Sequence, residues 1–142
     1  MSRVLAVAAV TLTLVAGSAG AAFAQDAEKG EQVFKKCMAC HRVGDDAKNN
    51  VGPVQNNLFG RKAGTVDGFR YSEINAAAGE AGLIWTEDAV LAYLADPNGY
   101  LRQFLAGKGK AEFADKSTKM AFKLADEQDR KDVIAYLKKF TK

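Results

Sequence analysis

The sequence has very little histidine and cysteine: one histidine and two cysteines stand among 142 residues. All three fall in the stretch "CMACH", as Cys37, Cys40 and His41. A structural zinc site is excluded because it needs a further ligand of this kind, and the chain has none. A disulfide between Cys37 and Cys40 would stabilise the fold little, because the gain grows with the length of chain that the bridge encloses.

The sequence also lacks a strand pattern before Cys37, which disfavours a redox dithiol of the thioredoxin type. The remaining interpretation of C-x-x-C-H is covalent haem attachment. On a helical turn, positions i, i+3 and i+4 share a face, so Cys37, Cys40 and His41 can point at one porphyrin. The sulfurs can reach its two vinyl groups while the imidazole stands over the iron. The motif therefore predicts one haem c.

Long apolar runs are lacking except near the start of the chain, where residues 4–15 are apolar and Ala22-Phe23-Ala24 fits a signal-peptidase site. The run is shorter than the roughly 20 residues of a membrane span. We interpret residues 1–24 as a signal peptide, with an uncleaved anchor of residues 4–24 as the alternative. Residues 25–142 are then expected to form a single haem-binding domain in the periplasm.

After residue 24 the sequence shows neither β alternation nor an internal repeat, and helical spacing predicts an all-α fold. Five helices are expected: residues 27–36, a helix capped by Ser72 that runs through Ala78, one capped by Thr86 that ends at Asp96-Pro97, one that begins at Pro97 and ends before Gly107, and one that begins at Asp126. The long loop of residues 44–68 needs a large ligand to pack on.

The second face of the haem iron needs a ligand other than histidine, because the only histidine is already used. Met120, in "KSTKMAFKL", is the methionine best placed for it. Met1 leaves with the signal peptide, and Met38 lies between the attachment cysteines on the His41 side. Lysine, tyrosine or an open site holding water are the alternatives.

From residue 25 onward the chain resembles class I cytochrome c, and most of all the bacterial cytochrome c-two branch. The resemblance rests on the stretches "EKGEQVF", "CMACH", "GP", "NLFGRKAG", "YSEIN", "LIWTEDAVLAYLADP", "STKMAF" and "DVIAYLKKF". It implies the class I fold, with helices and long loops wrapped around one covalent haem, and a crossing of the first and last helices at Gly30, Phe34, Tyr136 and Leu137.

The resemblance also implies the roles of nine site residues. Cys37 and Cys40 would form the thioether bonds, and His41 and Met120 would be the axial ligands. The Pro53 carbonyl would accept the ring hydrogen of His41, Tyr93 would lie beside the Met120 sulfur, and the propionates would lie near Arg61, Tyr71 and Trp85. The chain departs from the family at Gln55, where an apolar residue is usual. Relative to the mitochondrial type it is also longer before Trp85 and between Tyr100 and Thr118, as the c-two branch is. The sequence leaves open whether Gln55 faces the haem or the solvent.

An iron with a nitrogen and a thioether ligand has no open site, so the sequence predicts a soluble electron carrier that shuttles single electrons between membrane redox complexes, not an enzyme. Loss of Arg3 with the signal peptide lowers the net charge from +3 to +2, too little for general nucleic-acid binding. A monomer is expected. Five lysines near the motif or Met120 are expected to meet acidic faces of a cytochrome bc complex, a terminal oxidase or a photosynthetic reaction centre: Lys35, Lys36, Lys116, Lys119 and Lys123. The rivals are a haem peroxidase or gas-binding protein with a labile sixth ligand and, more remotely, a non-haem redox dithiol.

Overall fold

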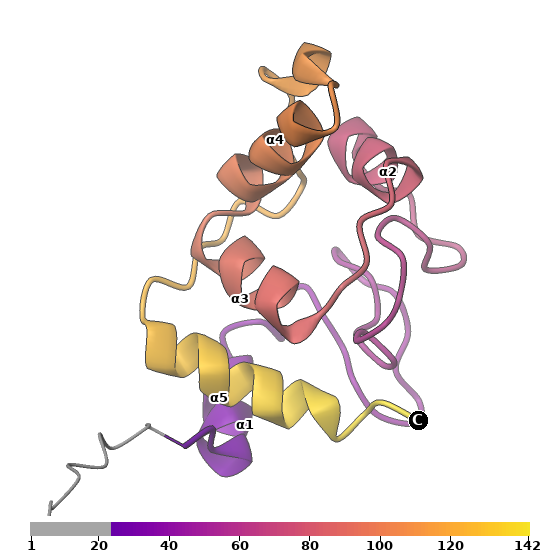
Figure 1. Ribbon diagram of the computed structural model, residues 1–142. Helices are drawn as coiled ribbons and strands as arrows, with labels where there is room; N and C mark the ends of the chain where they lie inside the picture. The colour runs from indigo at the N-terminus through magenta and orange to yellow at the C-terminus, as the bar shows by residue number, and fades with distance from the viewer. Residues whose placement is uncertain (1–23) are drawn as a thin grey trace, which may run out of the picture.

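The computed structural model describes residues 24–142, and its regular structure there is helical (Figure 1). The elements are α1 (Ala27–Phe34), α2 (Glu73–Glu80), α3 (Glu87–Ala95), α4 (Pro97–Gly107), the short 3-10 helix η1 (Ala111–Phe113) and α5 (Glu127–Lys138). Within these residues, β pairing is limited to one isolated bridge between Lys62 and Ile84. The predicted all-α class is confirmed, whereas η1 was not predicted. The predicted signal peptide lies outside the described residues, apart from Ala24.

Polar side chains cap two of the helices as the sequence predicts, whereas the predicted cap residue Ser72 precedes α2 without a side-chain cap hydrogen bond. The Thr86 hydroxyl accepts a hydrogen bond from the Ala89 amide at 3.1 Å, and the Asp126 carboxylate accepts one from the Asp129 amide at 2.8 Å. Asp26 caps α1 in the same way. These contacts satisfy amides that have no partner inside their own helix. Pro97 starts α4, where its missing N–H costs nothing.

Helices α1 and α5 cross at one end of the molecule (Figure 1). A Cβ added to Gly30 would lie 1.9 Å from the Asp132 carbonyl oxygen, so only glycine allows this approach. Beside it, the rings of Phe34 and Tyr136 pack with their centroids 5.4 Å apart. The buried Asp132 carboxylate accepts a hydrogen bond from the Asp26 amide at 2.9 Å, which ties the start of α1 to α5.

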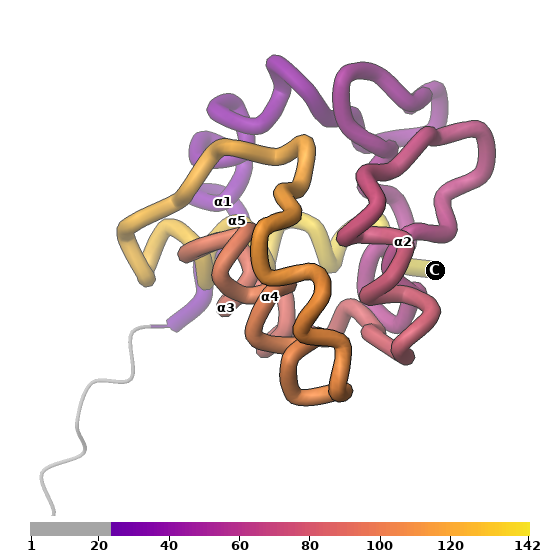
Figure 2. The backbone as a smooth tube through the Cα atoms, turned by 90° about the horizontal axis from the view of Figure 1, so that it is seen from above, coloured from indigo at the N-terminus to yellow at the C-terminus, as the bar shows by residue number. Residues whose placement is uncertain are grey.

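The long loop between α1 and α2 lies on one side of the molecule, with α3 and α4 on the other (Figures 1 and 2). Residues 60–63 of the first loop pair with residues 83–85 just before α3: the Gly60 amide donates to the Trp85 carbonyl at 2.9 Å, and the Ala63 amide to the Leu83 carbonyl at 2.8 Å. The loop is therefore fastened to the helical core at its middle. Among residues 24–142, every helix falls short of the length and apolar character that a membrane span requires.

Candidate haem site

The C-x-x-C-H motif forms a turn that continues directly from α1. The Cys37 amide donates to the Phe34 carbonyl at 2.8 Å, and the His41 amide donates to the Cys37 carbonyl at 2.9 Å. The two cysteines are half-buried and are not bridged to each other. Burial raises the pKa of the Cys37 thiol to about 11, so this sulfur is a neutral thiol. The turn thus holds two thiols and an imidazole in one short, hydrogen-bonded segment.

The His41 ring is held by the segment of Gly52 and Pro53. Its Nδ1 lies 2.8 Å from the Pro53 carbonyl oxygen, which is the contact that the family resemblance implies. A Cβ added to Gly52 would lie 2.4 Å from Cε1 of the ring, so the backbone passes directly against the imidazole. Burial lowers the pKa of His41, which favours the neutral ring. A neutral imidazole with Nδ1 engaged has Nε2 available as a metal ligand.

Gln55 turns toward His41 and away from open solvent. Its Nε2 lies 2.9 Å from His41 Nδ1 and 3.1 Å from the Pro53 carbonyl oxygen, and the residue is half-buried. The side chain therefore lies against His41 and Pro53 and does not extend into solvent. It also has a hydrogen-bond partner there, so it is not an unsatisfied buried amide.

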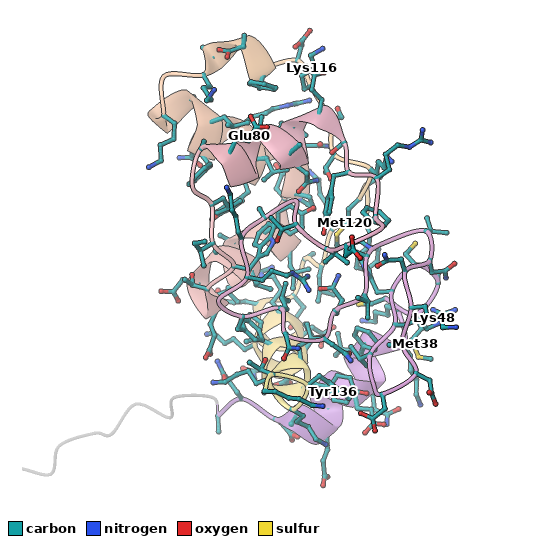
Figure 3. All side chains as sticks on the ribbon, turned by 90° about the vertical axis from the view of Figure 1, so that its right-hand side faces the viewer. Met38, Lys48, Glu80, Lys116, Met120 and Tyr136 are labelled. Carbon is teal, nitrogen blue, oxygen red and sulfur yellow. The ribbon has the colours of Figure 1, made fainter. Side chains whose placement is uncertain are left out.

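Met120 follows a segment that polar side chains fix in place. The Thr118 amide donates to Asn98 Oδ1 at 2.8 Å. Its hydroxyl accepts from Asn75 Nδ2 at 2.7 Å and from the Met120 amide at 3.3 Å. The Tyr93 hydroxyl lies 3.4 Å from the same Thr118 oxygen. Tyr93 and Met120 are thus linked through Thr118, and Figure 3 shows Met120 at mid-height, between the α4 end and the end where α1 and α5 cross.

Arg61 and Trp85 lie side by side, because the Trp85 amide donates to the Arg61 carbonyl at 2.9 Å. One guanidinium nitrogen of Arg61 donates to the Asn56 carbonyl at 3.0 Å. Its Nε is buried and has no hydrogen-bond partner among the described residues. Burial lowers the pKa of Arg61 and raises that of Tyr71, and the proximity of the two groups partly opposes both changes.

The residues present fit a haem. The buried guanidinium of Arg61 has a donor without a partner among the described residues, and the anionic oxygen of a propionate would suit it. The thiols of Cys37 and Cys40 suit the porphyrin edge, and the free Nε2 of His41 suits the iron.

Sequence reasoning missed the residues that support Met120. Asn75, Asn98 and Thr118 hold the segment before it, and Arg102 of α4 donates from Nε to the Lys116 carbonyl at 2.9 Å. The only signal for Asn75, Asn98 and Arg102 in the sequence is polarity on helices, and this does not show which loop they contact.

Comparison with known proteins identifies the family to which this arrangement belongs. The family model "Cytochrome c" matches residues 27–141. Cytochrome c2 iso-2 of Rhodospirillum centenum is 66% identical over 116 residues, which are 82% of this chain and 96% of that protein. Cytochrome c2 of Rhodopseudomonas palustris is 53% identical over 137 residues, 96% of both chains.

Solved structures agree with the sequence matches. The structure of cytochrome c2 from Rhodospirillum centenum superposes with a TM-score of 0.81 at 65% identity, and covers 82% of this chain and 99% of its own. The predicted fold and family resemblance are confirmed, and the rival enzyme is not supported. This chain belongs to the cytochrome c family, in its cytochrome c2 branch, and is an electron carrier with one covalent haem c, not an enzyme.

Proposed function

We propose that His41 Nε2 and the Met120 sulfur are the axial ligands of the haem iron and that Cys37 and Cys40 form its thioether bonds. The observation that carries this proposal is the Nδ1 contact of His41 with the Pro53 carbonyl, at 2.8 Å. It directs the hydrogen of the ring away from the iron side and leaves Nε2 as the lone-pair donor. The sulfur of Met120 follows the segment that Thr118 fixes.

The bound haem supplies an iron that alternates between the ferrous and ferric states. The chain's own residues would occupy both axial positions of that iron, so that no external ligand binds, and would keep its surroundings apolar. Trp85 is buried, and its ring packs against that of Tyr93 with centroids 4.9 Å apart. Arg61 and Tyr71 would hold the propionates, and Tyr93 would lie beside the methionine sulfur. A thioether ligand in an apolar site favours the ferrous state and so raises the reduction potential.

The carrier would work in the periplasm after cleavage of residues 1–24. The match to the Rhodopseudomonas palustris protein spans 137 residues and so includes part of this segment, and the apolar run with its Ala22-Phe23-Ala24 ending supports export. The C-x-x-C-H motif supports it as well. N-terminal sequencing of the protein purified from the periplasm tests the proposal, and a first residue of Gln25 is the expected result.

The partners would be membrane redox complexes with acidic docking faces: a cytochrome bc complex as donor, and a photosynthetic reaction centre or a terminal oxidase as acceptor. Lys119, next to Met120, supports this assignment because its side chain is exposed and has no carboxylate partner among residues 24–142. Its ammonium group donates to the Arg70 carbonyl oxygen, which leaves its charge unneutralised. Opposite charges would speed the encounter and make it sensitive to salt. The carrier is proposed to act as a monomer.

The ligand set is tested with Met120→Ala. The unmodified ferric protein should show the weak absorption band near the red end of the spectrum that reports methionine ligation. The variant should lose this band, have a lower reduction potential and gain peroxidase activity, because the sixth site is open.

Met38→Ala is the matched control, because Met38 is 47% exposed and follows an attachment cysteine. It should keep the band, the potential and the lack of peroxidase activity. A methionine band that persists in Met120→Ala would show that Met120 is not the ligand.

A further inference from the structure

The Gln55 side chain contacts both atoms of the hydrogen bond that orients His41. Three polar atoms form a closed triangle: His41 Nδ1 to the Pro53 carbonyl oxygen is 2.8 Å, Gln55 Nε2 to the same oxygen is 3.1 Å, and Gln55 Nε2 to His41 Nδ1 is 2.9 Å. The carbonyl oxygen is the acceptor in this group, and it has two lone pairs. Both nitrogens therefore donate to it.

The amide orientation follows from these contacts. If the Gln55 side-chain oxygen replaced Nε2, two oxygens would face each other at 3.1 Å with no hydrogen between them. The backbone fixes the approach as well, because the Gln55 amide donates to the Arg42 carbonyl at 3.0 Å, next to His41 in the chain. Gln55 is thus attached to the His41 segment through both its backbone and its side chain.

We propose that Gln55 is a positioning residue that weakens electron donation from His41 to the iron and so raises the reduction potential. This inference rests on the proposed ligand role of His41. A hydrogen bond from Nδ1–H to a carbonyl makes the imidazole a more basic ligand. A carbonyl that already accepts a second hydrogen bond from Gln55 is a weaker acceptor for the ring, so the imidazole keeps less negative charge and stabilises ferric iron less.

The amide dipole acts in the same direction. The Nε2–H end, which is its positive end, lies beside the imidazole. A positive end near the iron disfavours the additional positive charge of the ferric state. The sharing of the Pro53 carbonyl and the dipole of the Gln55 amide therefore both favour ferrous iron.

The test compares Gln55→Leu and Gln55→Glu with the unmodified protein by redox titration. Leu has a similar volume and no donor, so the His41 bond to Pro53 should strengthen and the potential should fall. The direction is diagnostic, because added apolar surface alone would raise the potential. Glu replaces the donor with an acceptor and should lower the potential further. Gln103→Leu makes the same change on an exposed face of α4 and should leave the potential unchanged.

Proton NMR of the ferrous proteins gives a direct second measurement. The His41 Nδ1–H resonance should move downfield in Gln55→Leu, as the hydrogen bond to Pro53 becomes stronger. A potential in Gln55→Leu that is unchanged or higher, or a resonance that stays in place, overturns the proposal. Failure of the ligand assignment would be recognised separately, because the methionine band would persist in Met120→Ala or His41 would show no signature of an iron ligand in the unmodified protein.

Discussion

The absence of a Cβ at Gly52 lets the His41 ring lie directly against the backbone. An added Cβ would stand 2.4 Å from Cε1 and 2.7 Å from Nδ1 of that ring. Gly52→Ala should therefore push the imidazole away from the Pro53 carbonyl and lower the free energy of unfolding by roughly 1–3 kcal/mol. Denaturant melts measure the loss, and the ferric spectrum should show a disturbed iron site.

Gly107→Ala is the control for this prediction. A Cβ at Gly107 meets nothing within 4 Å, and alanine is favoured over glycine in a helix by about 0.5–1 kcal/mol. It should leave stability unchanged or slightly increased. A Gly52→Ala protein as stable as the Gly107→Ala protein, with an undisturbed spectrum, would show that the ring has room to move.

The environment of His41 also shows the limit of sequence reasoning at the scale of residues. Its contact with Pro53 was expected, because the family resemblance assigns it. The orientation of Gln55 stayed open, since a loop can place a glutamine on either side at little cost and periodicity gives no direction there. The partners that decide the matter, Pro53 and His41, are 2 and 14 residues away along the chain.

At the scale of elements, helix ends were predictable and contacts between helix and loop were not. Thr86, Pro97 and Asp126 mark starts that the structure confirms, because a cap acts on amides within a few residues. The crossing of α1 and α5 was expected from the resemblance. The buried carboxylate of Asp132 that fastens it was missed, because its partner Asp26 is 106 residues away.

Helix α4 holds the segment before Met120, so weakening this contact should make Met120 easier to displace from the iron. Arg102 donates to the Lys116 carbonyl at 2.9 Å and to the Ser117 hydroxyl at 3.2 Å. Arg102→Ala should weaken this hold by about 1.5 kcal/mol. Added imidazole would then displace Met120 more easily, and its apparent affinity for the ferric protein should rise roughly tenfold.

Gln103→Ala is the matched control for Arg102→Ala, because Gln103 is the exposed neighbour on the same helix. Its affinity for imidazole should equal that of the unmodified protein. Equal affinity in the Arg102→Ala protein would mean that the Asn98 and Thr118 contacts hold the segment without help from Arg102.

At the scale of the whole molecule, three of the five lysines that were expected to contact partners form ion pairs within the described part of the chain, and two do not. Lys36 pairs with Asp129 at 2.9 Å, Lys116 with Glu73 at 3.1 Å and Lys123 with Asp96 at 2.9 Å. Within residues 24–142, Lys35 and Lys119 form no such pair, and Lys119 lies over the Phe69 ring at 5.7 Å. The positive field available to a partner is therefore narrower than the sequence suggests, and Lys119 is its member nearest to Met120.

Electron transfer to an isolated membrane acceptor should test this narrower field. Lys119→Glu should slow the reaction several-fold at low salt without moving the reduction potential, because it replaces attraction by repulsion at the docking face. Lys108→Glu makes the same change of charge at the end of α4, where Figure 1 places η1 and the tip of the molecule, and should slow it much less. Raising the salt should remove the difference, since charges are screened over about 10 Å at 0.1 M ionic strength. Equal rates for the two variants at low salt would mean that net charge, and not Lys119, guides the encounter.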